Sequence, residues 1–178
     1  YELIKEEPAP VKQESPVENS IEAKKADVEK RKPEIVDRYT DDEVKSNPNK
    51  IYVFGDNIQR TGTGGQAQIR NNSNAFGIAT KLKPNNNPDA FMSDKDLEAN
   101  KKVIDSDIQK ILSQNKPLVF PKDGFGTGLA KLKEKAPKTY EYLKQRLAEE
   151  FYFDNDKGEI NAKYDAELKA LENQNEEK

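Results

Sequence analysis

With 33% hydrophobic and 35% charged residues, this chain of 178 residues is too polar to be packed throughout, so only part of it can form a core. It contains no cysteine and no histidine, which excludes disulfides, thiolate catalysis, cysteine-type zinc sites and the commonest metal ligand and general base. The net charge of −3 does not favour nucleic acid as a partner, and no apolar run approaches the roughly 20 residues of a membrane span. Nothing in the sequence indicates a cofactor or a metal site.

Residues 1–49 are predicted to be a flexible charged linker. They alternate lysine and glutamate, contain Pro8, Pro10, Pro16 and Pro33, and offer few apolar residues at any sustained period. A transient charged helix over residues 24–32 is the alternative interpretation. We assign no chemistry to this segment.

Residues 50–153 are predicted to form the folded domain, which is long enough for one small core. The expected order is a strand at 50–54, a glycine loop, a short helix, a strand at 75–80, a long helix from Ser93, a strand at 117–121, a second glycine loop and a final helix after Pro137. Both long helices carry an apolar stripe, as helices that cover a core do. Strands that alternate with helices predict an α/β layered sheet.

Residues 154–178 are predicted to be a polar C-terminal tail. Ile160, Tyr164, Leu168 and Leu171 recur at spacings of four, four and three, which predicts one stripe of an amphipathic helix. This helix is expected to dock either on the domain or on a partner.

Glycine is concentrated in two short clusters. All of the nine glycines except Gly158 lie between residues 55 and 128, and seven of them fall within residues 55–65 and 124–128. Each cluster follows a β-branched and aromatic run, at residues 51–54 and 118–121. A strand that opens into glycines and then a helix commonly presents backbone N–H groups to phosphates, so this arrangement indicates a nucleotide-handling domain.

The first cluster offers both side chains and bare backbone to such a ligand. Asp56 and Asn57 are candidates to bond an adenine or ribose edge, and Arg60 and Arg70 are candidates to pair with phosphate. The glycines let the backbone approach a pyrophosphate, and they are Gly55, Gly62, Gly64 and Gly65. The alternative is an ordinary turn with solvated basic residues.

The second cluster has the same architecture. Its candidate ligand-binding residues are Gly124, Phe125, Gly126, Thr127 and Gly128. The loop is not a Walker loop, because no Gly-Lys-Ser/Thr closes it. It is also a poor dinucleotide fingerprint, because no acid stands at a strand end about twenty residues further on.

A set of motifs in this order resembles the macro domains. In chain order they are Thr80-Lys81-Leu82-Lys83-Pro84, Leu97 in a helix, Phe120-Pro121 and Gly126-Thr127-Gly128-Leu129. The chain is similar in particular to the small branch that removes ADP-ribose from acidic side chains, over about residues 50–151. It also resembles phage and bacterial proteins of unknown role that carry a Phe-Gly-Asp-Asn start.

The resemblance implies a small macro-like three-layer α/β fold with a mixed central sheet, flanked by polar tails, that binds ADP-ribose or a related nucleotide. It would place Asp56 near the adenine end, residues 62–65 along one phosphate, and residues 124–128 around the other phosphate and the distal ribose. Lys81 matches the lysine that attacks the distal ribose C1 atom in the glycohydrolase branch. That attack needs a neutral amine, and Lys83 is expected to supply a neighbouring cation that lowers the pKa of Lys81. The alternative for Lys81 is a strand-end lysine in water.

One departure from the family pattern bears on catalysis. Where the family's loop ends in an aspartate, this chain has Ala130 after Gly128-Leu129. Asp123, at the start of the loop, is the candidate to replace it as the catalytic partner of Lys81. Without a second acid or base, turnover falls by about 10²- to 10⁴-fold, whereas binding survives.

Three functions remain open on the sequence. The first is a module that binds ADP-ribose or a related nucleotide, with at most weak hydrolase activity, and the second is a true ADP-ribosyl hydrolase. The third is a non-enzymatic structural or interaction protein of a phage particle or another large assembly, in which the glycine loops only make turns. Polar tails at both ends favour attachment to something larger under all three. The resemblance implies a cytoplasmic protein of a bacterial or phage-infected cell, or one associated with the virion.

Overall fold

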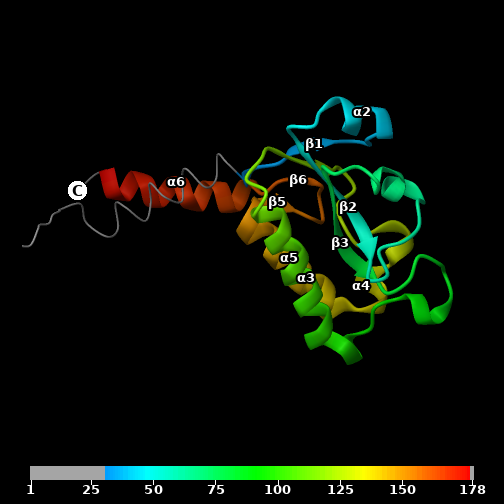
Figure 1. Cartoon of the computed structure of the whole chain (residues 1–178). Coiled ribbons are helices and arrows are strands. Elements are labelled where there is room, and N and C mark those ends of the chain that lie inside the picture. Colours follow the sequence, from blue (N-terminus) through cyan, green and yellow to red (C-terminus); the bar gives the residue numbers. More distant parts are fainter. Residues whose placement is uncertain (1–30, 177–178) are drawn as a thin grey trace, which may run out of the picture.

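The structure of this chain is a computed structural model in which residues 31–176 are described (Figure 1). Its elements are β1 (Glu34–Val36), α2 (Asp41–Ser46), β2 (Ile51–Asn57), the 3₁₀ helix η2 (Gly65–Ile69), β3 (Ala75–Lys81), the 3₁₀ turns η3 (Pro88–Ala90) and η4 (Asp94–Asp96), α3 (Leu97–Leu112), β4 (Leu118–Pro121), the 3₁₀ turn η5 (Gly128–Ala130), α4 (Leu132–Lys135), α5 (Pro137–Phe151), β5 (Phe153–Asp154), β6 (Glu159–Ile160) and α6 (Ala162–Glu176). The α/β class is confirmed. The predicted strands and the two predicted main helices are present within a few residues of their expected bounds.

The central sheet has four strands in the order β1-β4-β2-β3, and every strand pair in it is parallel. A mixed sheet was the expectation. Among the described residues, antiparallel pairing with this sheet is confined to a single bridge between Lys81 and Phe91. Parallel pairing brings the carboxyl ends of all four strands to the same edge of the sheet.

The two faces of the sheet are both covered, as a parallel sheet requires. Side chains of β2 alternate, so that Ile51 and Val53 pack with α3 and α5, whereas Tyr52 and Phe54 belong to a second cluster with α2 and η2. Figure 1 shows α3 and α5 running side by side on one face, with α2 and η2 away from them. The result is a helix layer, the sheet and a thinner layer of short helices.

Residues 34–49 belong to this fold, which corrects the linker predicted through residue 49. β1 pairs with β4 in parallel, and Tyr39 and Val44 are fully buried on the second face of the sheet. A three-residue strand and a six-residue helix are too short to show a hydrophobic period, so only long-range pairing reveals them. The remainder of the predicted linker, residues 1–30, lies outside the described residues.

The domain also extends beyond the predicted boundary at residue 153. β5 and β6 form an antiparallel hairpin in which Ile160 pairs with Phe153, so Ile160 is a strand residue and not part of the predicted helical stripe. The predicted helix itself is present as α6, which projects from the rest of the fold in Figure 1. Tyr164 anchors its first turns, with its ring 5.0 Å from that of Tyr152.

No helix within residues 31–176 is both long enough and apolar enough to cross a membrane.

Candidate functional site

A cleft of about 730 Å³ lies at the carboxyl ends of the four parallel strands. Each of the four strands contributes to its lining at or just after its carboxyl end: Asp37 follows β1, Asn57 ends β2, Lys81 ends β3 and Pro121 ends β4. This edge of an open parallel sheet is where α/β proteins generally bind their ligands. The volume is within the range of about 300–1,000 Å³ that is typical of small-molecule pockets.

Both glycine clusters open into this one cleft. The residues predicted for the site that line it are Gly55, Asp56, Asn57, Gly62, Gly64, Gly65, Arg70, Lys81, Asp123, Gly124, Gly126 and Thr127. Three others, Arg60, Phe125 and Gly128, are not part of its lining. The two clusters are more than 50 residues apart in sequence, and parallel pairing of β2 with β4 brings them together.

The first glycine loop, residues 61–65, presents unpaired backbone donors. The N–H groups of Gly62, Thr63 and Gly64 donate no hydrogen bond within the described residues. A Cβ built on Gly64 or on Gly65 would meet nothing within 4 Å. This stretch of backbone therefore lines the cleft without side chains at Gly64 and Gly65, and its free N–H groups are of the kind that bind anions.

Arg70 holds this loop and is not free to bind phosphate as predicted. Its guanidinium donates to both carboxylate oxygens of Asp56, at 3.0 and 2.6 Å, and to the carbonyls of Gly62 and Thr61, at 2.8 and 3.0 Å. It also lies over the ring of Phe54, 5.3 Å from the centroid. The bidentate pair with a nearly buried carboxylate commits both charges to each other, so Asp56 and Arg70 shape the loop.

Arg60 is likewise committed to a structural pair. It donates to both oxygens of Asp107 on α3, at 2.7 and 2.9 Å, and it reaches Asp56 at 3.4 Å. Asp107 also accepts the N–H of Ala79 on β3, at 2.8 Å. The sequence did not predict that Asp107 would turn inward to bind Arg60, because an acidic residue in an amphipathic helix ordinarily faces solvent.

Asn57 carries an open acceptor at the end of β2. Its Nδ2 donates to the carbonyl of Thr61 at 2.8 Å, whereas its buried Oδ1 has no hydrogen-bond partner in the described structure. The register of β2 against β3 shifts between Asp56 and Asn57, and such bulges commonly re-aim a side chain beside a site. A buried acceptor without a partner costs about 1–3 kcal/mol, which a donor on a ligand would offset.

The second glycine loop, residues 123–128, is braced from behind. The side chain of buried Asn155 accepts from the N–H of Phe125 and donates to its carbonyl, both at 2.8 Å. Phe125 therefore points into the core, where its ring meets that of Phe120 edge-on at 5.2 Å. It supports the loop and is not available to a ligand.

The second loop also lines the cleft and contains unpaired backbone donors. The N–H groups of Gly126 and Thr127 donate no hydrogen bond within residues 31–176, and Gly126 is buried. The Thr127 hydroxyl donates to the carbonyl of Asp123 at 2.9 Å, which closes the loop on itself. Gly128 lies just outside the lining, at the start of η5, while its neighbour Leu129 lines the cleft and is 71% exposed.

Lys81 lies in the cleft with its ammonium partly held. Its Nζ donates to the carbonyl of Asn85 at 2.6 Å and to Oδ1 of Asn86 at 3.3 Å, and it sits 5.0 Å from the ring centroid of Phe91. Burial lowers the pKa of Lys81 below its ordinary value. At a given pH, the neutral amine form of Lys81 is therefore more populated than that of a lysine in water.

Lys83, the cation expected to lower the pKa of Lys81, forms an ion pair of its own. Lys83 pairs with Asp89 at 2.6 Å, so its charge is balanced locally. A second cation, Lys135, lies 5.1 Å from the centroid of the same Phe91 ring that Lys81 contacts. Asp123 and Ala130 both line the cleft, so the candidate acid and the position that lacks one belong to the same cleft as Lys81.

Two lining residues, Asp37 and Arg38, were missed by sequence reasoning. They follow β1 directly, within the segment interpreted as linker, and both are exposed. The sequence feature that could have indicated them is the apolar pair Ile35-Val36 followed by charged residues, because the other strands also end where apolar residues give way to polar ones. That pair is too short to predict a strand by itself.

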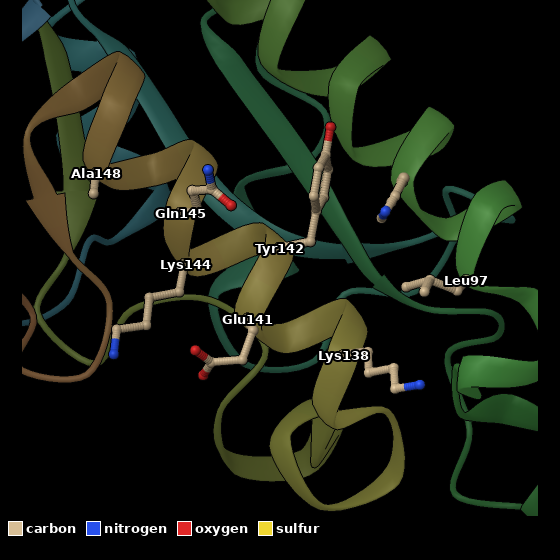
Figure 2. Close-up of a pocket in the computed structure, with 8 residues that line it drawn as sticks. Leu97, Lys138, Glu141, Tyr142, Lys144, Gln145 and Ala148 are labelled. Atoms are coloured by element: carbon tan, nitrogen blue, oxygen red, sulfur yellow. The ribbon is translucent and has the colours of Figure 1, made fainter.

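A second hollow, of about 450 Å³, lies between α3 and α5 (Figure 2). Figure 2 shows Tyr142 reaching from α5 toward α3, and its hydroxyl donates to Asp105 at 2.6 Å. Long charged or polar side chains such as Lys138, Glu141 and Lys144 form much of the rest of its lining. No residue predicted for the site lies there, and the glycine loops contribute nothing to it.

The described residues contain no group of three or more acidic side chains placed to hold a metal ion.

Residues 34–146 match the model of a protein family described as a family of unknown function, DUF7831. The chain belongs to this family. The match begins with β1 and ends within α5, so it includes all four strands and both glycine loops of the cleft. The hairpin that carries Asn155 lies beyond it. No curated protein matches the chain. No solved structure matches it either.

Proposed function

We propose that this chain binds ADP-ribose, or a related nucleotide or ADP-ribosylated ligand, in the cleft at the carboxyl ends of its strands. One observation carries the proposal: two glycine loops distant in sequence line a single cleft, and several of their backbone N–H groups donate no hydrogen bond within the described residues. Two separate runs of free N–H groups suit a ligand with two adjacent phosphates. The resemblance to macro domains supplies ADP-ribose as the specific candidate.

The remaining lining fits the rest of such a ligand. Asn57 lines the cleft, and rotation of its amide would offer the unpaired Oδ1, which is buried in this structure, to an amino or hydroxyl donor of an adenine or a ribose. Exposed Leu129 offers apolar surface at the other loop. Asp56 is assigned a supporting role in place of adenine recognition, because both of its oxygens are occupied by Arg70 and the N–H of Asn57.

Weak ADP-ribosyl hydrolase activity is the enzymatic extension of this proposal. Lys81 would act as the nucleophile on the distal ribose, helped by the burial that lowers its pKa, and Asp123 would act as its acid-base partner. Ala130 stands where the macro domains that the chain resembles have an aspartate, so turnover is expected to be slow relative to binding. Lys81→Ala should abolish release of ADP-ribose from an ADP-ribosylated glutamate peptide while binding changes little.

The test is calorimetric titration of the full chain with ADP-ribose, with AMP and ATP as comparisons. The full chain is required because residues 34–49 and the β5–β6 hairpin both complete the fold. We expect micromolar binding that prefers ADP-ribose. No heat with any of the three ligands, from protein shown to be folded, would overturn the proposal.

Gly64→Val is the variant that connects binding to the cleft. Its Cβ points into open space and its φ of −74° suits any residue, so the fold is retained while the loop is obstructed. ADP-ribose affinity should fall at least about tenfold, because the ligand can no longer approach the backbone. Ala99→Val also introduces a valine, by adding two methyl groups on an exposed face of α3, and should leave affinity unchanged.

A non-enzymatic interaction protein is the second candidate, and the observation that favours it is the projection of α6 from the domain (Figure 1). Under this alternative the glycine loops only make turns. Truncation after residue 161, which removes α6, distinguishes the two candidate functions. Nucleotide binding that survives the truncation is a property of the cleft. Association with a larger assembly that is lost on truncation depends on α6.

A further inference from the structure

We infer that Arg38 is an anion-binding residue of the cleft and pairs with the diphosphate of a ligand held over the first glycine loop. That ligand is a nucleotide on the proposed function, on which this inference rests for the ligand's identity. Arg38 lies outside both glycine loops and outside every motif that pointed to the site. Three features of its surroundings support the assignment.

Arg38 is held on the wall of the cleft by its neighbour. The backbone N–H of Tyr39 donates to Oε1 of Gln66 at 3.0 Å, and Nε2 of Gln66 donates to the carbonyl of Tyr39 at 3.1 Å. The buried Tyr39 hydroxyl donates to the carbonyl of Val53 on β2. Because Gln66 lies in η2, directly after the first glycine loop, this clamp fixes the backbone of Arg38 beside that loop.

Among the described cations that line the cleft, Arg38 is also the one whose side chain has no partner. Among the cleft-lining residues that the structure describes, the other cations are Arg70 and Lys81. Arg70 is bound by Asp56 and two loop carbonyls, and Lys81 donates to two asparagines. No hydrogen bond, ion pair or ring contact is formed by the Arg38 side chain within residues 31–176, and it is exposed.

The chemistry of the wall selects an oxyanion as the partner. The adjacent carboxylate of Asp37 is balanced by Lys122, whose Nζ lies 3.6 Å away, so it does not satisfy Arg38. Beside Arg38 the loop presents the unpaired N–H groups of Gly62, Thr63 and Gly64. A guanidinium fork opposite a row of backbone donors matches the several oxygens of a diphosphate better than a single carboxylate.

The experiment is a titration of the ¹⁵N-labelled full chain with inorganic pyrophosphate, followed by the amide signals of residues 62–64 in ¹H–¹⁵N spectra. We expect saturable shifts in the unaltered chain, an affinity about tenfold lower in Arg38→Ala, and partial retention in Arg38→Lys, which keeps the charge without the fork. Lys116→Ala removes an equal charge at the opposite ends of the strands and should leave the affinity unchanged.

Equal affinity of pyrophosphate for Arg38→Ala and the unaltered chain would overturn the inference, and so would an equal loss in Lys116→Ala. An absence of saturable shifts in the unaltered chain would overturn it as well. The outcome is independent of the proposed function: pyrophosphate binding that depends on Arg38, with no heat from ADP-ribose, would keep Arg38 as an anion site and remove ADP-ribose as the ligand.

Discussion

The two glycine loops have the same appearance in the sequence and use their glycines for different physical reasons. In the first loop a Cβ on Gly64 or Gly65 would enter open space, so packing does not require glycine there. In the second loop a Cβ on Gly124 would lie 2.5 Å from Oδ1 of Asn155, and one on Gly126 would lie 2.9 Å from Leu132. Packing therefore requires glycine at Gly124 and Gly126, as it does at Gly62 of the first loop, where a Cβ would lie 2.9 Å from Pro84, whereas a Cβ on Gly128 would meet nothing within 4 Å.

The loops also differ in what holds them. The first is tied to the sheet by charged side chains, above all the pair of Arg70 with Asp56. The second is tied by a neutral amide, Asn155, from a hairpin outside the family match. A glycine-rich pattern therefore does not by itself distinguish access for a ligand from close packing, and substitution of an open glycine such as Gly64 should differ in effect from substitution of a crowded one such as Gly126.

The largest effect is expected at Gly158, in the hairpin that braces the second loop. A Cβ there would lie 1.4 Å from the carbonyl oxygen of Lys122, and φ is +63°. Because backbone cannot move aside as a side chain can, Gly158→Ala should lower the free energy of unfolding by about 3 kcal/mol or more in urea denaturation. Gly65→Ala has a similar φ of +55° and no neighbour within 4 Å, so it should cost only about 1–2 kcal/mol. Equal losses in the two variants would show that the hairpin does not press on Lys122.

Next in size is Asn155→Ala, which removes the brace itself. The buried N–H and carbonyl of Phe125 would lose their partners, so the free energy of unfolding should fall by about 2–4 kcal/mol. Asn155→Asp keeps the acceptor but places an ionised oxygen against the buried carbonyl of Phe125, so its loss of stability at neutral pH should be at least as large as that of Asn155→Ala. Hydrogen exchange at the Phe125 amide checks the mechanism: protection that survives in Asn155→Ala would contradict it.

A direct comparison of the loops uses Gly126→Ala and Gly64→Ala. Gly126 has φ of +78° and a crowded Cβ position, so its replacement should cost about 1–3 kcal/mol of unfolding free energy. Gly64→Ala should stay within about 0.5 kcal/mol of the unaltered chain. Thermal denaturation of the pair measures both, and a Gly64 variant as unstable as the Gly126 variant would remove the distinction between the loops.

The smallest effect is expected from Asp156, also in the hairpin. Hydrogen bonds from Lys144 and from Tyr140 hold the pKa of Asp156 below its ordinary value of 3.8. A carboxylate with a depressed pKa stabilises the fold above its unfolded pKa, and this contribution is lost as pH falls through the folded value. Between pH 5 and about 3 the unaltered chain should therefore lose stability more steeply than Asp156→Asn. Parallel curves in urea titrations at several pH values would argue against a stabilising role.

Much of the site could be anticipated, because strand ends and glycines are local signals. Residues 51–54 and 118–121 read as strands, and parallel pairing then brings the loops that follow them to one edge of the sheet. The partners of Arg60 and Arg70 could not be anticipated. Asp107 lies in a helix nearly fifty residues away from Arg60, and no local pattern marks a carboxylate that will turn inward.

The sequence by itself determined the α/β class, the main strands and helices and the two glycine loops, because hydrophobic period and glycine content act over a few residues. Only the tertiary structure decided that Arg38 belongs to the cleft while Arg60 and Arg70 are committed elsewhere, and that Asn155 braces the second loop. Those outcomes depend on contacts between segments far apart in the chain, where burial makes each polar group find a partner.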